Sequence, residues 1–244
     1  MPFERILSEL NLSWLDVAAF VSFFLAWSGY VWFALWRAKS VPSLHSSMDH
    51  YRRLWMLRMI DRDNRMVDVN IMRNLTRSSQ FFASTTMLIL GALIALLGYV
   101  QQAMDVVSGL PFTVKASQRL LEIKVVLLVV IFVYAFFKFT WAIRQLGFCA
   151  TLVGAAPKPP KDNPEQYASD IDRIAAVTSY AGTTFNDGLR SFYFALAAMA
   201  WFLHPYLMLL ATVWVVWVLY RREFESRTLK ALADRGGWVF LPPP

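Results

Sequence analysis

Four apolar stretches, each long enough to cross a lipid bilayer, constrain the fold of this chain more than any other feature. They cover residues 15–36, 81–99, 120–143 and 192–220. A crossing needs about 20 mostly apolar residues, so the first three fit well and the fourth is several residues too long. The sequence therefore predicts an all-α integral membrane protein, a four-helix bundle that forms a single membrane domain over residues 1–244.

Composition supports this class and argues against others. Hydrophobic residues make up 57% of the chain, whereas soluble domains contain about 45–50%. A net charge of +7 in a soluble chain would suggest nucleic acid as a partner, but here we assign it to anionic phospholipids and expect no nucleic acid. Glu4 and Glu9 precede the first stretch and no small-residue cleavage site follows it, so we expect this span to be retained.

The distribution of Lys and Arg predicts the orientation in the membrane. The loops after the first and third stretches hold 14 of these residues, against 8 in the remaining segments outside the membrane. We therefore expect a multi-pass protein of the bacterial inner (plasma) membrane, with both long loops in the cytoplasm and both termini outside. The basic tail disagrees with this assignment. A chain that broke at His204–Pro205 and returned would place the tail in the cytoplasm, but prolines often merely kink a span, and we expect the kink.

The first loop contains an arginine-rich segment over residues 50–80. Its seven basic residues include no lysine, which favours planar, bidentate recognition over a generic positive charge; they are Arg52, Arg53, Arg58, Arg62, Arg65, Arg73 and Arg77. At about 100° per residue, Arg58, Arg62, Arg65 and Arg73 share one face, opposite an apolar face. With no Gly or Pro between residues 51 and 81, the pattern predicts one amphipathic helix that continues into the second span.

A second amphipathic helix is predicted over residues 164–188. It follows a proline-rich connector, with Asn163 as its N-cap and Pro164 at its first position. We expect its Asp170 and Asp172 to meet the arginines of the first loop. The predicted bundle thus carries two amphipathic cytoplasmic helical loops.

Polar and small residues in the spans leave two interpretations open. Ser84 and Thr85 precede Gly91 and Ala95 in the second span, a pattern that suits either close packing of neighbouring helices or the lining of a polar pathway. Lys138 in the third span either extends its amine to the interface or forms a site for an anion or proton.

Three longer motifs resemble a known family. They are YRRLWMLRMIDRDNRMVDVNIMRNLTRSSQFFAST, FNDGLRSFYFALAAMAWF and YRREFESR. Together they resemble an uncharacterised family of bacterial four-span membrane proteins, with plant relatives, that is catalogued only as a domain of unknown function. The resemblance covers about residues 24–227 and implies a shared architecture without an assigned activity. The motif positions carried over are Arg58, Arg62, Arg65, Asp68, Asn70, Arg73, Asn74, Arg77, Asn186, Gly188, Arg190, Arg222, Glu223 and Phe224.

Enzyme chemistry finds little support in the sequence. The chain has three histidines and one cysteine, with no paired-histidine metal motif, no glycine-rich phosphate loop and no CxxC. We expect no enzyme, no cofactor and no metal.

Two functional classes remain open. One is a homo-oligomeric channel or transporter for anions or small solutes, in which Ser84 and Thr85 line the pore. The other is a protein without transport, either a membrane scaffold or a protein that binds anionic phospholipids. The candidate binding residues for either class are Arg58, Arg62, Arg65, Arg73, Arg77, Lys138 and Arg190.

Overall fold

The computed structural model describes residues 13–38, 40–102, 104, 117–156 and 164–233. All regular elements in these ranges are helical: α2 (Trp14–Arg37), α3 (Leu44–Ile60), α4 (Met66–Gly98), α6 (Gln118–Ala155), α7 (Pro164–Met199), the 3₁₀ helix η1 (Ala200–Phe202), α8 (Pro205–Phe224) and α9 (Arg227–Ala233). By length and composition, α2, α4 and α6 are able to cross a membrane. The predicted all-α class and its membrane character are therefore confirmed at this level.

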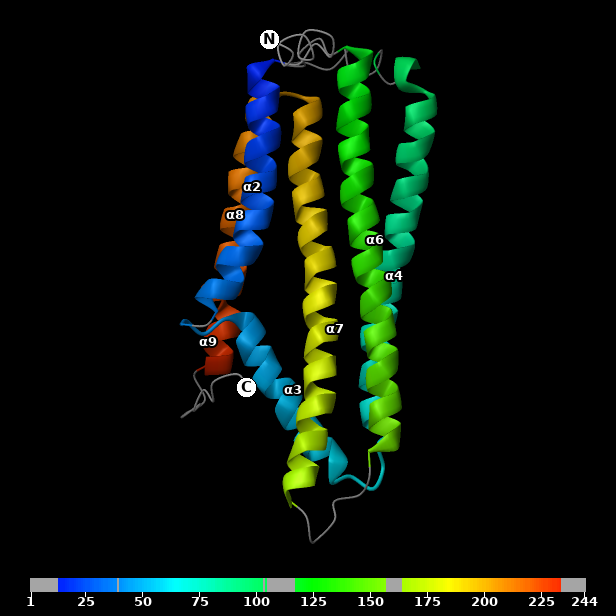
Figure 1. Cartoon of the computed structure of the whole chain (residues 1–244), viewed down its shortest axis with the longest axis vertical. Coiled ribbons are helices and arrows are strands. Elements are labelled where there is room, and N and C mark those ends of the chain that lie inside the picture. Colours follow the sequence, from blue (N-terminus) through cyan, green and yellow to red (C-terminus); the bar gives the residue numbers. More distant parts are fainter. Residues whose placement is uncertain (1–12, 39, 103, 105–116, 157–163, 234–244) are drawn as a thin grey trace.

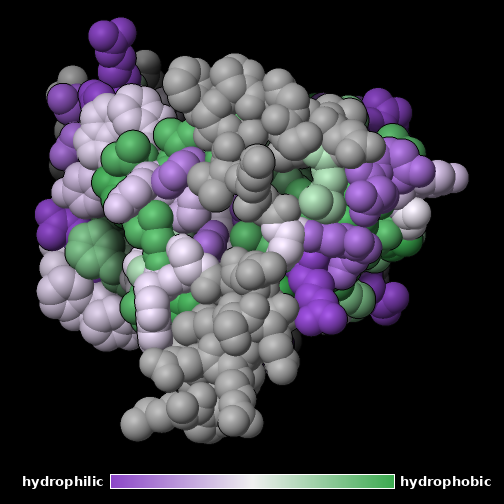
Figure 2. Space-filling view, turned by 90° about the horizontal axis from the view of Figure 1, so that it is seen from above, coloured by the Kyte–Doolittle hydropathy of each residue, from purple (hydrophilic) through white to green (hydrophobic). Residues whose placement is uncertain are grey.

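The helices form two stacked layers (Figure 1). α4, α6 and α7 run through both layers, whereas α2 and α8 lie in the upper layer and α3 lies in the lower one. The upper core joins five helices, through residues such as Phe23, Leu90, Ile131, Phe194 and Met208. Seen from above (Figure 2), hydrophobic side chains are visible between hydrophilic and intermediate ones on both sides of the view.

The last apolar stretch forms two antiparallel helices instead of one kinked span. α7 ends at Met199, the chain turns through η1, and α8 returns beside α2 (Figure 1). His204 is extended and its Nδ1 accepts the N–H of Tyr206 at 3.2 Å, while Pro205 opens α8. The predicted single span over residues 192–220 is therefore wrong, and the upper layer holds five helices where four were expected.

The arginine-rich segment also differs from its prediction. It is not one helix, because α3 ends at Ile60 and α4 begins at Met66. At the elbow between them, the side-chain oxygen of Asn64 accepts the N–H of Met66 at 2.9 Å, a local bond that competes with helix. The single arginine face is therefore wrong, since Arg58 and Arg73 lie on different helices. The continuation of α4 into the second apolar stretch agrees with the prediction.

The lower layer brings the two long loops together. Its core combines residues of α3, α4, α6 and α7, including Met56, Met72, Cys149 and Ile171. α7 begins at Pro164, as predicted, and the proposed N-cap Asn163 lies outside the described residues.

Candidate functional site

Charged side chains gather where the two layers meet. Lys138 Nζ lies 2.9 Å from Asp187 Oδ2, and an Arg190 nitrogen lies 3.5 Å from the other carboxylate oxygen. Lys138 follows Gln118, the first residue of α6, by 20 positions. At 1.5 Å per residue this separation is about 30 Å, the thickness of the bilayer hydrocarbon. We name Lys138, Asp187, Arg190, Arg222 and Glu223 the boundary cluster.

Aromatic rings cover the arginines of the boundary cluster. The guanidinium carbon of Arg190 lies 5.8 Å from the ring centre of Tyr30 on α2. Arg222 donates to the hydroxyl of Tyr193 at 3.0 Å and lies 5.3 Å from the centre of that ring. Such cation–aromatic contacts contribute about 0.5–2 kcal/mol each, more where water is excluded. These contacts connect α7 with α2 and α8.

Glu223 connects the end of α8 to the beginning of α3. Its carboxylate accepts the backbone N–H of His45 at 3.0 Å, two residues after the N-cap Ser43 and within the first turn of α3. A carboxylate at this end of a helix is favoured because unpaired N–H groups point towards it. The His45 ring also lies 3.2 Å from the hydroxyl of Thr183 on α7. Glu223 of the boundary cluster therefore links the beginning of α3 to the end of α8.

Arg37, the last residue of α2, lies in a cage of three rings. Its guanidinium carbon is 6.0 Å from the centre of Phe33, 5.9 Å from Tyr220 and 5.8 Å from Phe224. Its Nε is buried, and the described part of the chain supplies it with no hydrogen-bond partner. The cage fixes the lower end of α2 against α8.

Two of the predicted binding arginines have structural partners at the elbow. Arg62 donates to Asp68 at 2.6 Å, and the indole of Trp55 donates to the same oxygen at 2.7 Å. Arg65 donates to the carbonyls of Val153 and Ala156 at 2.8 and 2.7 Å, so it satisfies the end of α6. These two guanidinium groups hold the elbow and the end of α6.

The acidic residues of α7 meet only part of the arginine-rich segment. Arg53 donates to Asp172 at 2.6 Å, and this bond raises the pKa of the Arg53 guanidinium. Asp170 lies 3.7 Å from Arg173 of its own helix. The expected contact between the two loops is thus present, but Arg53 makes it rather than Arg65 or Arg73. Arg58 is exposed on α3.

Arg73 and Arg77 belong to a long exposed face of α4. Its members follow one another at helical spacings of three or four residues, and all are exposed: Asn70, Arg73, Arg77, Phe81, Ser84, Leu88, Gly91, Ala95 and Gly98. We name this set the α4 outer face. An added Cβ at Gly91 or Gly98 would meet no atom within 4 Å. The small residues expected to pack inside the bundle therefore face outwards.

The two predicted pore-lining residues differ in position. Ser84 is exposed on the α4 outer face, whereas Thr85 is half-buried beside it. The Thr85 hydroxyl donates to the carbonyl of Phe81 at 2.9 Å, within its own helix. Lys138 does not stand alone near the interface, because it is paired with Asp187.

The comparisons place this architecture in a family. A family model described as "Protein of unknown function, DUF599" matches residues 18–228. The chain belongs to this family. Comparison with curated proteins and with solved structures gives no match. The resemblance seen in the three motifs is thereby confirmed.

Within this DUF599 chain, two of the motifs converge on the boundary cluster. Arg190 comes from the motif at 185–202, and Arg222 and Glu223 come from the motif at 220–227. Gly188 has a packing role: an added Cβ would lie 2.7 Å from the ring of Phe139 on α6. The motif requires glycine here because α6 and α7 approach closely.

A buried polar group in the upper layer was not predicted as a site. Asp16, Lys124 and Trp201 are each at most 5% exposed. Asp16 accepts the indole N–H of Trp201, and Lys124 donates to the carbonyl of Trp201. The sequence did contain a signal for this group, since Asp16 and Lys124 are charged residues inside apolar stretches. An ionisable residue at such a depth requires a partner.

Metal chemistry has no visible basis in the described ranges. They contain no group of three or more His, Cys, Asp or Glu side chains placed to hold a metal ion.

Proposed function

We propose that this chain crosses the bilayer five times, associates with copies of itself through the α4 outer face, and provides a path for anions along that interface. The proposal rests on three features: the distribution of charge between the two ends of the bundle, the closed interior of a single chain, and the exposed composition of α4.

Charge supports a cytoplasmic lower layer. Among the described residues, sixteen Lys and Arg lie at the boundary or below it: Arg37, Arg52, Arg53, Arg58, Arg62, Arg65, Arg73, Arg77, Lys138, Arg144, Arg173, Arg190, Arg221, Arg222, Arg227 and Lys230. Towards the opposite end the described ones are Arg119 and the buried Lys124. Because α8 returns, the tail after it joins the basic side, and the disagreement in the sequence count disappears.

The interior of one chain is packed with apolar and aromatic side chains where it is described. The rings of Phe82, Phe139 and Phe192 pack against one another with centroids 5.3 to 5.8 Å apart, Phe82 stacked on Phe139 and Phe192 edge-to-face with both. Two cavities of about 670 and 660 Å³ lie beside α6 and α8, and both are lined mostly by apolar side chains. An aqueous path would therefore have to lie between chains.

The α4 outer face supplies the observation that carries the proposal. Its upper half presents Gly91 and Ala95, small residues that allow two helices to approach closely in a membrane. Its lower half presents Arg73 and Arg77 to solvent. Copies in one membrane share an orientation, so α4–α4 contact brings equivalent arginines together around one axis. Rings of arginine at a pore entrance select anions.

Cross-linking tests the association. In a Cys149→Ala background, Ala95→Cys should form a disulfide-linked dimer in membranes under mild oxidation. Val213→Cys, equally exposed but on α8, is the matched control and should remain monomeric. Equal cross-linking at both positions would indicate random collision and would contradict an interface formed by α4.

Flux measurements test the anion path. Protein reconstituted into liposomes should release iodide or chloride faster than potassium, and Arg73→Gln together with Arg77→Gln should reduce the anion flux at least tenfold. Arg173→Gln changes the same charge at a site 75% exposed on α7 and should leave the flux unaltered. Ser84→Leu should reduce flux while cross-linking through Ala95→Cys persists.

One observation favours the second function, a binding module for anionic phospholipid. Arg77 precedes Gly98 by 21 residues, about 30 Å along the helix, which places it at the lower headgroup level. Two results together would favour the lipid-binding module over the channel. Liposomes with the reconstituted protein would show no anion flux, and the wild type would retain anionic lipid that the Arg77→Gln variant does not retain.

A further inference from the structure

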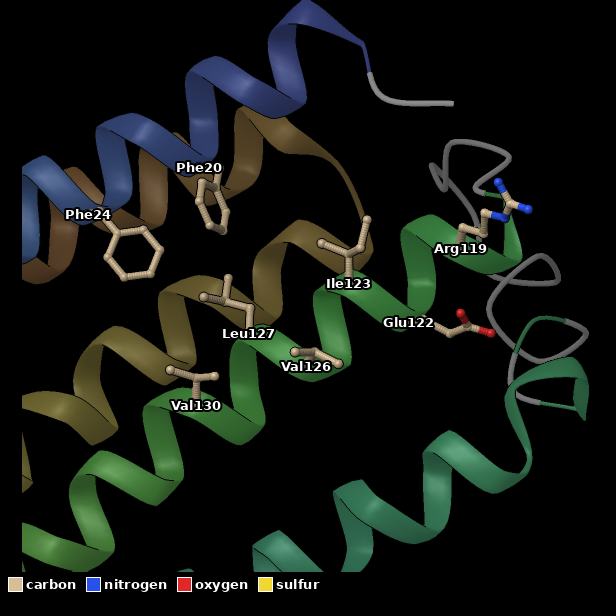
Figure 3. A pocket seen from close by; sticks show the side chains of 8 residues that line it. All are labelled: Phe20, Phe24, Arg119, Glu122, Ile123, Val126, Leu127 and Val130. Carbon is tan, nitrogen blue, oxygen red and sulfur yellow. The ribbon is translucent and has the colours of Figure 1, made fainter. Parts of the chain in front are cut away.

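A groove of about 670 Å³ lies between α2 and α6 in the upper layer (Figure 3). Its size is within the range of ligand sites, about 300–1,000 Å³. Apolar side chains form most of its wall: Phe20, Phe24, Ile123, Val126, Leu127 and Val130. Val126 and Val130 are about half exposed, so the groove opens sideways, where α2 and α6 would meet hydrocarbon.

The length of the groove matches one leaflet of a bilayer. From Arg119 to Val130 it follows eleven residues of α6. At 1.5 Å per residue this is about 16 Å, which is about half of the hydrocarbon thickness. An extended acyl chain that lay along α6 from the headgroup level would reach the middle of the bilayer at Val130.

The polar end of the groove carries both signs of charge. Arg119 and Glu122 stand at the start of α6, beyond the apolar side chains (Figure 3). They are three residues apart and so lie on the same side of the helix. The Glu122 carboxylate also accepts a hydrogen bond from Gln118 at 2.9 Å. A cation suits a phosphate, and an adjacent carboxylate suits an ammonium group.

We propose that this groove binds one zwitterionic phospholipid with an amine headgroup, of the phosphatidylethanolamine type. One acyl chain lies along the apolar wall, the phosphate meets Arg119, and the ammonium meets Glu122. An anionic headgroup without an amine would gain only the contact with Arg119 and would be repelled by Glu122. This site is separate from the α4 outer face and does not depend on anion passage.

Native mass spectrometry of the full chain in detergent tests the site. After incubation with equal amounts of phosphatidylethanolamine and phosphatidylglycerol of identical acyl chains, the wild type should retain one phosphatidylethanolamine at least fivefold more often. Val130→Trp should fill the groove and reduce retention at least fivefold. Ile94→Trp, an exposed position on α4 outside the groove, is the matched control and should bind as the wild type does.

Substitutions of the two charged residues test the contacts with the lipid headgroup independently of the apolar wall. Glu122→Gln should remove the preference for phosphatidylethanolamine while one lipid still binds, and Arg119→Gln should weaken both lipids. If Val130→Trp does not fold by circular dichroism and size exclusion, Val126→Phe takes its place. Equal retention of the two lipids by the wild type, or unchanged retention in the groove-filling variant, would overturn the proposal. If the groove-filling variant lost an oligomer but kept its lipid, the groove would be a contact with a second copy of the chain. That result would overturn the lipid proposal as well.

Discussion

The indole N–H of Trp201 donates to the carboxylate of Asp16 over 2.7 Å, although 185 residues separate them in the chain. The carbonyl of Trp201 accepts from Lys124 Nζ over 2.8 Å, and the ammonium lies 5.3 Å from the centre of the indole. Residues from α2 and α6 thus hold one side chain and one backbone group of η1. The turn between α7 and α8 is fixed from two sides.

Asp16→Ala should destabilise the upper layer by about 1–3 kcal/mol, because it leaves the buried indole N–H of Trp201 unpaired. The measurement is thermal unfolding in detergent. Val21→Ala, at an exposed position of the same helix, should change stability by less than about 0.5 kcal/mol. Equal effects of the two substitutions would mean that the Asp16–Trp201 bond does not stabilise the turn.

Gly188→Ala should lower the unfolding temperature, because the new methyl group would lie against the ring of Phe139. Overpacking of this kind costs about 1–3 kcal/mol. Gly147→Ala provides the contrast: its added Cβ meets nothing within 4 Å, so the gain in helix propensity should stabilise by up to about 1 kcal/mol. Phe139→Leu should partly rescue Gly188→Ala. Failure of that rescue would contradict the close-approach explanation.

Arg62→Gln should loosen the elbow between α3 and α4. Asp68 is fully buried and would keep only the bond from Trp55, so a cost of about 1–3 kcal/mol is expected. Asp68→Asn in the same chain should recover part of the loss, because a neutral amide is easier to bury. Hydrogen exchange at residues 66–72 reports on the elbow directly. Protection that remained at the wild-type level would show that the pair is dispensable.

Arg53→Gln should have a much smaller effect. Both partners of the Arg53–Asp172 pair are about half exposed, and exposed ion pairs contribute about 0–1 kcal/mol. The pKa of Arg53 is raised in the folded protein, so the stabilisation from this pair is fully present below the ordinary pKa of arginine. It would be lost only above about pH 12. Chemical denaturation should therefore show no pH dependence from this group near neutrality. A large effect that persisted in high salt would contradict the exposed character of the pair.

Cysteine labelling should report Ser169→Cys and Thr228→Cys from the same, cytoplasmic side of the membrane. Gln102→Cys, near the upper end of the bundle, should react from the opposite side. All three would be made in the Cys149→Ala background. Labelling of Ser169→Cys and Thr228→Cys from opposite sides would contradict the five-crossing arrangement.

The spans could be predicted where an apolar run is continuous. They could not be predicted where contacts between distant residues determine whether the chain continues or turns. α2, α4 and α6 follow from their apolar runs. At His204–Pro205 the sequence permits a kink or a turn, and the turn is stabilised by α8 packing on α2, which no local pattern encodes. The elbow at Asn64 did carry a local signal, since asparagine often bonds the backbone two residues later.

The candidate site shows the same division. The sequence selected Lys138 and Arg190 as binding candidates, but it did not select Asp187, which contacts both of them. The prediction treated seven arginines as one group, whereas Arg62 and Arg65 stabilise the elbow and the end of α6, and Arg58, Arg73 and Arg77 are exposed. Hydrophobic periodicity cannot distinguish these roles, because an arginine that caps a helix and an arginine in solvent occupy the same polar positions.

α6 and α7 pass from one layer to the other without a break, over 38 and 36 residues. A continuous helix resists bending, and its kinks require identifiable causes. The salt bridge between Lys138 and Asp187 joins the two helices where the layers meet. A displacement of either helix in the lower layer should therefore be passed along its axis to the upper layer, so the two layers are expected to move together.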